Sequence, residues 1–211
     1  MAKIDEVQTN VETGKTKLIE GLVQEALDEG NKPSDILDAM VKAMSIVGDK
    51  FSAGTIFVPE MLVAAKAMAK GVEVIKPHLS GQTSASFGTC VIGTVQGDLH
   101  DIGKNLVSMM IGSAGFTMVD LGVDVSAEKF IQAIKENENV TLVACSGLLS
   151  TTMPALKETV QTIKGSGLTG FKVMVGGAPV TADYAKEIGA DAYASDAGGA
   201  AAKAKEIVAA A

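Results

Sequence analysis

The sequence has no tryptophan, and aromatic residues make up only 4% of its 211 residues. Single-stranded nucleic acid is bound largely through aromatic side chains on which the bases stack, so this composition argues against such a platform. Positive charge is also in the minority, and the formal net charge of −7 argues against recognition of a phosphate backbone. We therefore expect no nucleic-acid partner.

Long apolar runs are missing as well. No run is long enough to cross a bilayer, and residues 1–14 are polar and mixed in charge, unlike a signal peptide. The two cysteines, Cys90 and Cys145, lie in strand-like apolar runs and form no C-x-x-C pair, which is typical of small core residues. These features predict a cytoplasmic protein with no membrane partner.

The first third of the chain shows helical periodicity only. Apolar positions recur three and four residues apart in four stretches, which are separated by Gly30 and by prolines. Four amphipathic helices with short connections predict a small bundle over residues 1–79. Residues 80–87 are rich in serine and small residues and predict a linker.

From residue 88 onward, strand-like and helix-like patterns alternate. The strand-like runs are residues 90–95, 116–121, 140–146, 171–175 and 191–194. This alternation predicts a parallel sheet with helices on both faces. The expected fold class is therefore α/β, in which a four-helix bundle precedes a flavodoxin-like (Rossmann-type) five-stranded sheet, order 2-1-3-4-5, over residues 88–211.

The first strand and the loop after it carry the most informative residues, GTCVIGTVQGDLHDIGKN from Gly88 to Asn105. Ligands of open parallel sheets bind at the carboxyl ends of strands, where His100 is expected. Residues two apart in an extended segment point the same way, so Asp98 can accept a hydrogen bond from one imidazole nitrogen and leave the other free for a metal. The spacing alone leaves a solvated or capping role for His100 as the alternative. The glycines here match neither a P-loop nor a dinucleotide fingerprint.

Two other strand ends are unusual. The segment SGLLSTT, which begins at Ser146, offers four hydroxyl groups, and helix capping by Ser150, Thr151 or Thr152 is the simpler interpretation. Gly176-Gly177 either makes a turn or lets a ligand approach the backbone closely.

Residues 98–103, DLHDIG, resemble the D-x-H-x-x-G signature of cobalamin-binding domains found in methionine synthase and in the corrinoid proteins of anaerobic methyltransferase systems. Residues 51–60, FSAGTIFVPE, resemble the helical cap of that family. Residues 146–148 resemble its S-x-L motif, and Gly176-Gly177 its G-G pair. The matches occur in family order and cover nearly the whole chain.

The resemblance implies cobalamin bound base-off and His-on, with His100 as the lower cobalt ligand, Asp98 orienting it, and Thr152 completing a ligand relay. It implies a cap in which Phe51 and Val58 cover the upper face of the corrin. The remaining implied cofactor contacts are Gly97, Asp101, Ile102, Gly103, Ser146, Leu148, Ser150, Thr151, Gly176 and Gly177.

The function implied by the resemblance is that of a methyl carrier. A substrate:corrinoid methyltransferase would methylate cob(I)alamin on this chain, and a second methyltransferase would move the methyl from methylcob(III)alamin to tetrahydrofolate or a thiol coenzyme. A reductive activator of the corrinoid is a further expected partner. Donors of similar carriers include methanol, methylamines, betaines and phenyl methyl ethers. With two histidines and no zinc-ligand cluster, the chain is not expected to turn over substrate alone.

Three alternatives remain from the sequence. A cobalamin-binding mutase subunit needs a substrate barrel, and the N-terminal cap argues against it. A cobalamin-sensing regulatory module needs a basic DNA-reading helix pair, which is not seen. A receiver-type signalling module needs a phosphorylatable aspartate where the third strand ends at Ser146.

Overall fold

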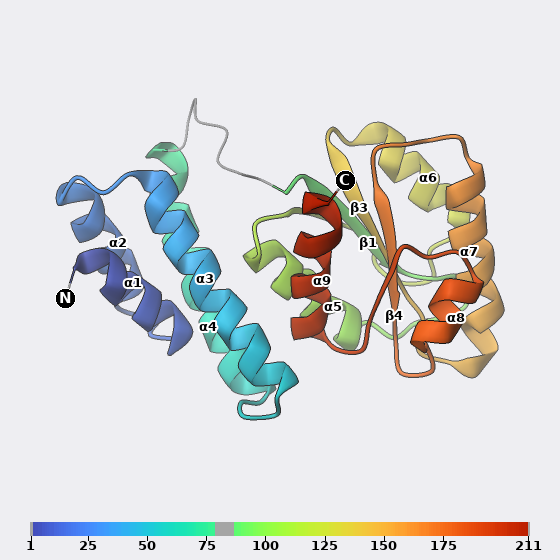
Figure 1. Cartoon of the computed structure of the whole chain (residues 1–211), viewed down its shortest axis with the longest axis horizontal. Helices are drawn as coiled ribbons and strands as arrows, with labels where there is room; N and C mark the ends of the chain where they lie inside the picture. The colour runs from blue at the N-terminus through green and yellow to red at the C-terminus, as the bar shows by residue number, and fades with distance from the viewer. Residues whose placement is uncertain (1, 79–86, 211) are drawn as a thin grey trace. The chain divides into compact units, whose positions relative to one another are not determined.

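The computed structural model describes residues 2–78 and 87–210, and the chain divides into two compact units, Met1–Ser86 and Phe87–Ala211 (Figure 1). Except for Phe87, the predicted linker lies outside the described residues. Over these two described ranges, no helix is long and apolar enough to cross a membrane.

The first unit is a bundle of four helices, as predicted. They are α1 (Lys3–Glu12), α2 (Ile19–Asp28), α3 (Pro33–Ser52) and α4 (Val58–Ile75), followed by a short 3-10 turn, η1 (Lys76–His78). Each helix buries one apolar stripe; Met40 and Met44 of α3 share the core with Met61 and Met68 of α4. The methionine-rich stripe is therefore core packing, in which flexible side chains fill the space between helices.

The start of α4 is set by a local hydrogen bond. Phe57 lies just before the helix in an extended conformation, and its backbone N–H donates to Glu60 Oε2 at 3.2 Å. The carboxylate satisfies an amide at the helix start and also lies at the positive end of the helix dipole. The helix thus begins beside Pro59, one of the prolines that separate the predicted helical stretches.

The second unit alternates strands and helices, and the predicted fold class is confirmed. Its elements are β1 (Thr89–Thr94), α5 (Ile102–Ser113), β2 (Thr117–Asp120), α6 (Ala127–Glu136), β3 (Val140–Ser146), η2 (Ser150–Thr152), α7 (Met153–Gly165), β4 (Lys172–Gly176), α8 (Ala182–Glu187), β5 (Ala192–Ala194) and α9 (Ala197–Ala209). All pairings are parallel, and the strand order β2-β1-β3-β4-β5 is the flavodoxin-like order expected from the sequence.

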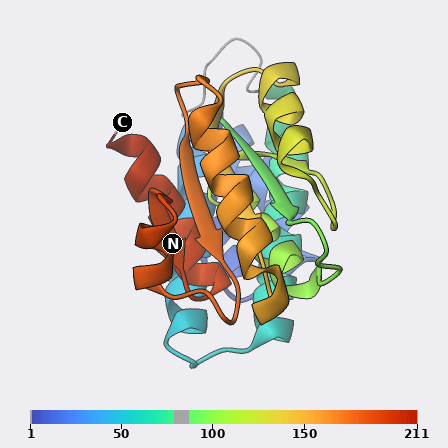
Figure 2. The same cartoon turned by 90° about the vertical axis from the view of Figure 1, so that its right-hand side faces the viewer.

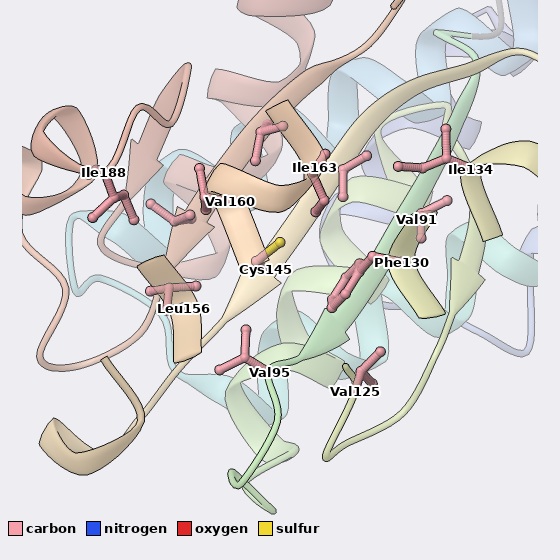
Figure 3. Packing of buried hydrophobic residues seen from close by; sticks show 14 of the residues in the cluster. Val91, Val95, Val125, Phe130, Ile134, Cys145, Leu156, Val160, Ile163 and Ile188 are labelled. Carbon is pink, nitrogen blue, oxygen red and sulfur yellow. The ribbon is translucent and has the colours of Figure 1, made fainter. Parts of the chain in front are cut away.

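Helices cover both faces of this sheet. In Figures 1 and 2, α6, α7 and α8 lie on one face, while α5 and α9 lie on the other. Figure 3 shows the first of these two cores, where Phe130 of α6 and Leu156 of α7 pack with Val91 and Cys145 of the sheet. Because strands buried on both faces carry apolar side chains in both directions, β1 and β3 appear in the sequence as nearly continuous apolar runs.

Both cysteines are core residues. Cys90 and Cys145 are buried and unpaired. Burial raises the pKa of both thiols, that of Cys145 to about 12, so both remain protonated at neutral pH.

Candidate functional site

The carboxyl ends of β1, β3 and β4 are level with one another in the sheet. Thr94 pairs with Ser146, and Ser146 pairs with Gly176, so the loops that follow these strands emerge at one edge. The predicted cofactor contacts of the second unit are the last residues of β3 and β4, residues of the loops that follow β1, β3 and β4, or residues in the first turn of the next helix. The structure therefore brings three separate motifs of the sequence to one place.

The loop after β1 begins with a tight turn. Asp98 N–H donates to the carbonyl of Val95 at 3.1 Å, and Gly97, the third residue of the turn, has φ = +80°. These are the features of a type II turn, which favours glycine at this position because a Cβ disfavours positive φ. The turn brings the side chain of Asp98 inward, and Asp98 is fully buried.

The carboxylate of Asp98 receives hydrogen bonds from two loops. Its Oδ1 accepts from His100 Nδ1 at 2.8 Å and from His100 N–H at 3.1 Å. Its Oδ2 accepts from the N–H of Leu148 at 2.7 Å, the N–H of Leu149 at 3.3 Å and the hydroxyl of Thr152 at 2.8 Å. A single side chain thus ties the end of β1 to the end of β3.

These donors keep Asp98 ionised. Burial alone raises the pKa of this carboxyl, but the hydrogen bonds from Leu148, His100 and Thr152 together outweigh burial and hold the pKa well below its usual range. Hydrogen bonds to the charged form favour that form. At neutral pH the site therefore contains a fixed negative charge next to the imidazole.

The imidazole of His100 is oriented for an external ligand. An ionised carboxylate can only accept, so Nδ1 carries the proton and Nε2 of the neutral ring keeps its lone pair. The side chain is 50% exposed, and no described residue forms a hydrogen bond with Nε2. The hydroxyl of Thr94, buried at the end of β1, donates to the carbonyl of His100 at 2.9 Å and holds the backbone in place.

Thr152 does not cap α7, although it occupies the N-cap position. Its side chain makes no capping hydrogen bond; its hydroxyl lies 2.8 Å from Asp98 Oδ2 and 2.9 Å from the carbonyl oxygen of Leu149. Ser150 and Thr151 are exposed in η2, which likewise has no side-chain cap. The capping interpretation of this segment is therefore wrong, because no helix N–H donates to these side chains and the hydroxyl of Thr152 is turned towards the carboxylate of Asp98.

Exposed apolar side chains lie in the same two loops as His100 and the donors to Asp98. Leu99 is 72% exposed and Ile102 is 77% exposed on either side of His100, and Leu148 and Leu149 are also exposed at the end of β3. Large apolar side chains gathered at a strand end mark a binding surface for an apolar group.

Two glycines of the site, Gly177 and Gly176, face nearby backbone oxygens, whereas Gly103 faces open space. Gly177 has φ = +135° and lies so close to the carbonyl oxygen of Gly147 that a Cβ would overlap it, so the fold itself requires this glycine. Gly176 lies near the carbonyl of Ala194, where a Cβ would be 3.0 Å from the oxygen. Gly103, in the first turn of α5, has open space where its Cβ would be. Because Gly103 lies at the strand-end loop that carries His100, this open space is available to a ligand.

The donor set fits a metal ion whose other ligands belong to a cofactor. Within the ranges that the structure describes, no cluster of three or more His, Cys, Asp or Glu side chains is placed to hold a metal ion. The site offers instead one imidazole nitrogen, exposed apolar side chains and open space at Gly103. A flat, largely apolar macrocycle with a metal at its centre matches these three properties.

The two predicted cap residues belong to the helical unit. Phe51 is half-buried in the last turn of α3, and Val58 is the first residue of α4 and is 36% exposed. Phe57, beside it, is more exposed still. Their contact with a cofactor stays a prediction.

Several residues that shape the site were missed by sequence reasoning. The backbone donors of Leu148 and Leu149 were missed because only side chains were considered. Lys104 was missed too: it is buried in α5, and its Nζ binds Asp120 Oδ2 at 2.5 Å and Asn105 Oδ1 at 2.7 Å. A lysine inside an otherwise apolar helix face, with an acidic residue at the end of the next strand, was the available signal.

Comparison with known proteins gives matches to both units of the chain. Residues 88–204 match the B12 binding domain family, and residues 4–76 match a second B12 binding domain family. The chain is 41% identical to dimethylamine corrinoid protein 1 of Methanosarcina acetivorans, over 98% of this chain and 97% of that protein. It is 44% identical to trimethylamine corrinoid protein 1 of Methanosarcina mazei, over 82% of each chain.

A solved structure shows the same likeness. The methanol:cobalamin methyltransferase complex MtaBC of Methanosarcina barkeri matches with a TM-score of 0.84 and 30% identity, over 99% of this chain and 80% of that chain. The matches cover the helical unit and the α/β unit alike. The chain therefore belongs to the corrinoid proteins of methylamine and methanol methyltransferase systems, in which a helical B12-binding domain precedes an α/β B12-binding domain.

Proposed function

We propose that this chain is a corrinoid methyl carrier whose lower cobalt ligand is His100. The observation that supports this most directly is the Asp98–His100 pair at 2.8 Å, with a half-exposed imidazole whose Nε2 has no hydrogen-bond partner among the described residues. Bound cobalamin would supply a cobalt ion that takes up and releases a methyl group. In this base-off, His-on arrangement, the imidazole replaces the cofactor's own base.

The chain's own residues control the protonation of the ligand. Because the pKa of Asp98 is held low, a proton that enters the Asp98–His100 pair is carried by the imidazole at Nε2. That proton would occupy the lone pair of Nε2, so the protonated imidazole could not bind a metal, and loss of the proton would free the lone pair again. The hydroxyl of Thr152 has one proton and two acceptors within 2.9 Å, Asp98 Oδ2 and the carbonyl of Leu149, so it can follow a change of charge on the pair.

Other residues hold the macrocycle. Leu99, Ile102 and Leu148 provide the apolar surface beside the imidazole, and Gly103 leaves space there. Gly97, Asp101, Ser146, Ser150, Thr151, Gly176 and Gly177 complete the proposed contacts at the strand ends. Phe51 and Val58 of the helical unit are proposed to shield the other face of the cofactor from water.

The proposed partners are two methyltransferases and a reductive activator. The names of the relatives point to methylamines or methanol as the methyl donor of the first enzyme. The second would act on tetrahydrofolate or a thiol coenzyme. A mutase subunit or a sensing module is less well supported, because the named relatives that match along the whole chain are corrinoid proteins.

The test is to mix the apo-protein with hydroxocobalamin, desalt it and record the absorbance. The wild-type protein should retain one equivalent. After reduction to cob(II)alamin, electron paramagnetic resonance should show an axial-nitrogen triplet that becomes a doublet when the protein carries 15N-histidine.

The chain contains only one other histidine, His78 in η1, so His78→Gln is a matched control that should retain both signals. His100→Ala should lose the histidine coupling while keeping part of the cofactor. A wild-type protein that is colourless after desalting would contradict the proposal, and so would a triplet that 15N-histidine labelling leaves unchanged.

A further inference from the structure

Asp124, in the loop between β2 and α6, has an unusual backbone conformation. Its φ is +54°, and the only other non-glycine residue with positive φ among those described is Asn139, at +51°. Aspartate tolerates this left-handed region better than most residues but still at a cost, so a contact that holds it there is expected.

The conformation arises from one extra residue in the ladder beyond β2. Thr94 N–H donates to the carbonyl of Gly122 at 3.0 Å, and a regular parallel ladder would then have the carbonyl of Thr94 accept from Asp124. It accepts instead from Val125, at 2.9 Å. The backbone N–H of Asp124 is therefore free to bind elsewhere, as at a β-bulge.

Both polar groups of Asp124 bind the turn that carries Asp98. Its carboxylate Oδ1 accepts from Gly97 N–H at 2.7 Å, and its own N–H donates to the carbonyl of Asp98 at 3.0 Å. We propose that Asp124 is a positioning residue, which fixes the Val95–Asp98 turn and thereby the Asp98–His100 pair for cobalt ligation. This inference rests on the function proposed above.

The Val95–Asp98 turn has two accessible forms. In a type II turn the central peptide, here between Gln96 and Gly97, can rotate to give a type I turn. The N–H of Gly97 belongs to that peptide, so an acceptor at 2.7 Å holds the type II form. The second contact, from the N–H of Asp124 to the carbonyl of Asp98 at 3.0 Å, holds the residue that orients His100.

Three variants test this inference. Asp124→Gly relaxes the backbone and removes the acceptor, whereas Asp124→Asn keeps an acceptor oxygen and tolerates the left-handed conformation. The matched control is Asn139→Gly, which relaxes the other positive-φ residue just before β3, at the opposite end of the strands from the site. We expect Asp124→Gly to weaken hydroxocobalamin binding about tenfold, as for loss of a hydrogen bond behind a metal ligand, and Asp124→Asn and Asn139→Gly to stay within about twofold of wild type.

A second measurement uses the apo-protein. With 15N-histidine labelling, His100 of the wild type should appear as the Nδ1–H tautomer, and its Nδ1–H correlation should broaden or vanish in Asp124→Gly while the melting temperature stays within a few degrees. A loss of stability alone would leave that correlation sharp in the folded protein. Wild-type affinity together with an unchanged His100 signal in Asp124→Gly would overturn the inference. Failure of the wild-type protein to bind cobalamin would instead contradict the proposed function.

Discussion

At the scale of single residues, Asp98 links three stretches of the chain. Its two oxygens receive hydrogen bonds from His100, from the backbone after β3 and from Thr152, and none of its side chain reaches solvent. A buried carboxylate is stable only when such donors compensate for lost hydration. The residue that orients the proposed ligand is therefore also a structural residue.

We predict that Asp98→Asn lowers the free energy of unfolding of the apo-protein by about 3 kcal/mol. An amide has one acceptor oxygen, and its NH2 group would face donors that now bind a carboxylate; each buried group left unpaired costs about 1–3 kcal/mol. Urea unfolding followed by circular dichroism measures the change. Asp101→Asn, at an exposed residue of the same loop, is the control and should change stability by less than about 0.5 kcal/mol. Equal effects of the two substitutions would contradict the prediction.

The lowered pKa of Asp98 also predicts a dependence on pH. A carboxyl whose pKa is lower in the folded state contributes stability that is present above its unfolded pKa of about 3.9 and is lost as the pH falls towards the folded pKa. The difference in unfolding free energy between wild type and Asp98→Asn should therefore be constant from pH 7 to 5 and shrink below about pH 4. A difference that stays constant down to pH 3 would show that the folded pKa is not lowered.

Gly103 predicts a trade-off between stability and binding. A Cβ at this position meets open space, so Gly103→Ala should stabilise the apo-protein by about 0.5–1 kcal/mol through helix propensity. The same methyl group should weaken cobalamin binding, because it occupies the proposed ligand space. Thermal unfolding of the apo-protein and equilibrium binding of hydroxocobalamin measure the two effects. The comparison is Gly165→Ala, which also meets open space in a helix but lies at the end of α7; it should leave binding unchanged.

At the scale of elements, the sequence was sufficient to predict a helix or strand wherever the period of its apolar residues matches the faces that are buried. β3 begins and ends where the sequence predicted, at Val140 and Ser146, because a strand buried on both faces is a continuous apolar run with polar residues at its ends. The helices between the strands were expected for the same kind of reason, because their apolar positions recur three and four residues apart. Strand order followed from the alternation of strands and helices, which restricts topology strongly.

The parts that could not be predicted are contacts between loops that are distant in the sequence. Local pattern made Thr152 a reasonable capping residue, and only the family resemblance implied that it acts with Asp98, 54 residues earlier. No sequence pattern marked Asp124, because its role depends on one extra residue in the backbone hydrogen-bond ladder beyond β2. Sequence patterns report which residues are buried, but not which donor meets which acceptor.

The contact between α5 and β2 gives an element-scale prediction. Lys104 is buried and Asp120 is partly exposed, so removal of the aspartate leaves a buried ammonium group without its charge partner. We expect Asp120→Ala to cost about 3 kcal/mol and Lys104→Met to cost less than about 1 kcal/mol, because an apolar side chain of similar length avoids the desolvation of a charge. Chemical unfolding of both variants and of the double variant measures this asymmetry. Equal costs for the two single variants would contradict it.

At the scale of the whole molecule, the two compact units each have a core of their own. We predict two transitions in scanning calorimetry of the apo-protein. Met40 and Leu156 are fully buried in different units. Met40→Ala should therefore lower the transition temperature of one unit only, and Leu156→Ala that of the other. Each substitution should reduce the free energy of unfolding of its own unit by about 2–5 kcal/mol. A single transition that both variants shift together would show that the units unfold as one.

The hydrogen bonds of Asp98 have a consequence for how the protein acquires a ligand. All of them form within the chain, so the loops after β1 and β3 are ordered when the polypeptide folds. The conformational entropy of these loops is lost when the protein folds, so ordering them does not weaken ligand binding. The strand ends thus form a preorganised receptor, and the rate at which it fills depends on the incoming molecule's approach and not on a slow rearrangement of these loops.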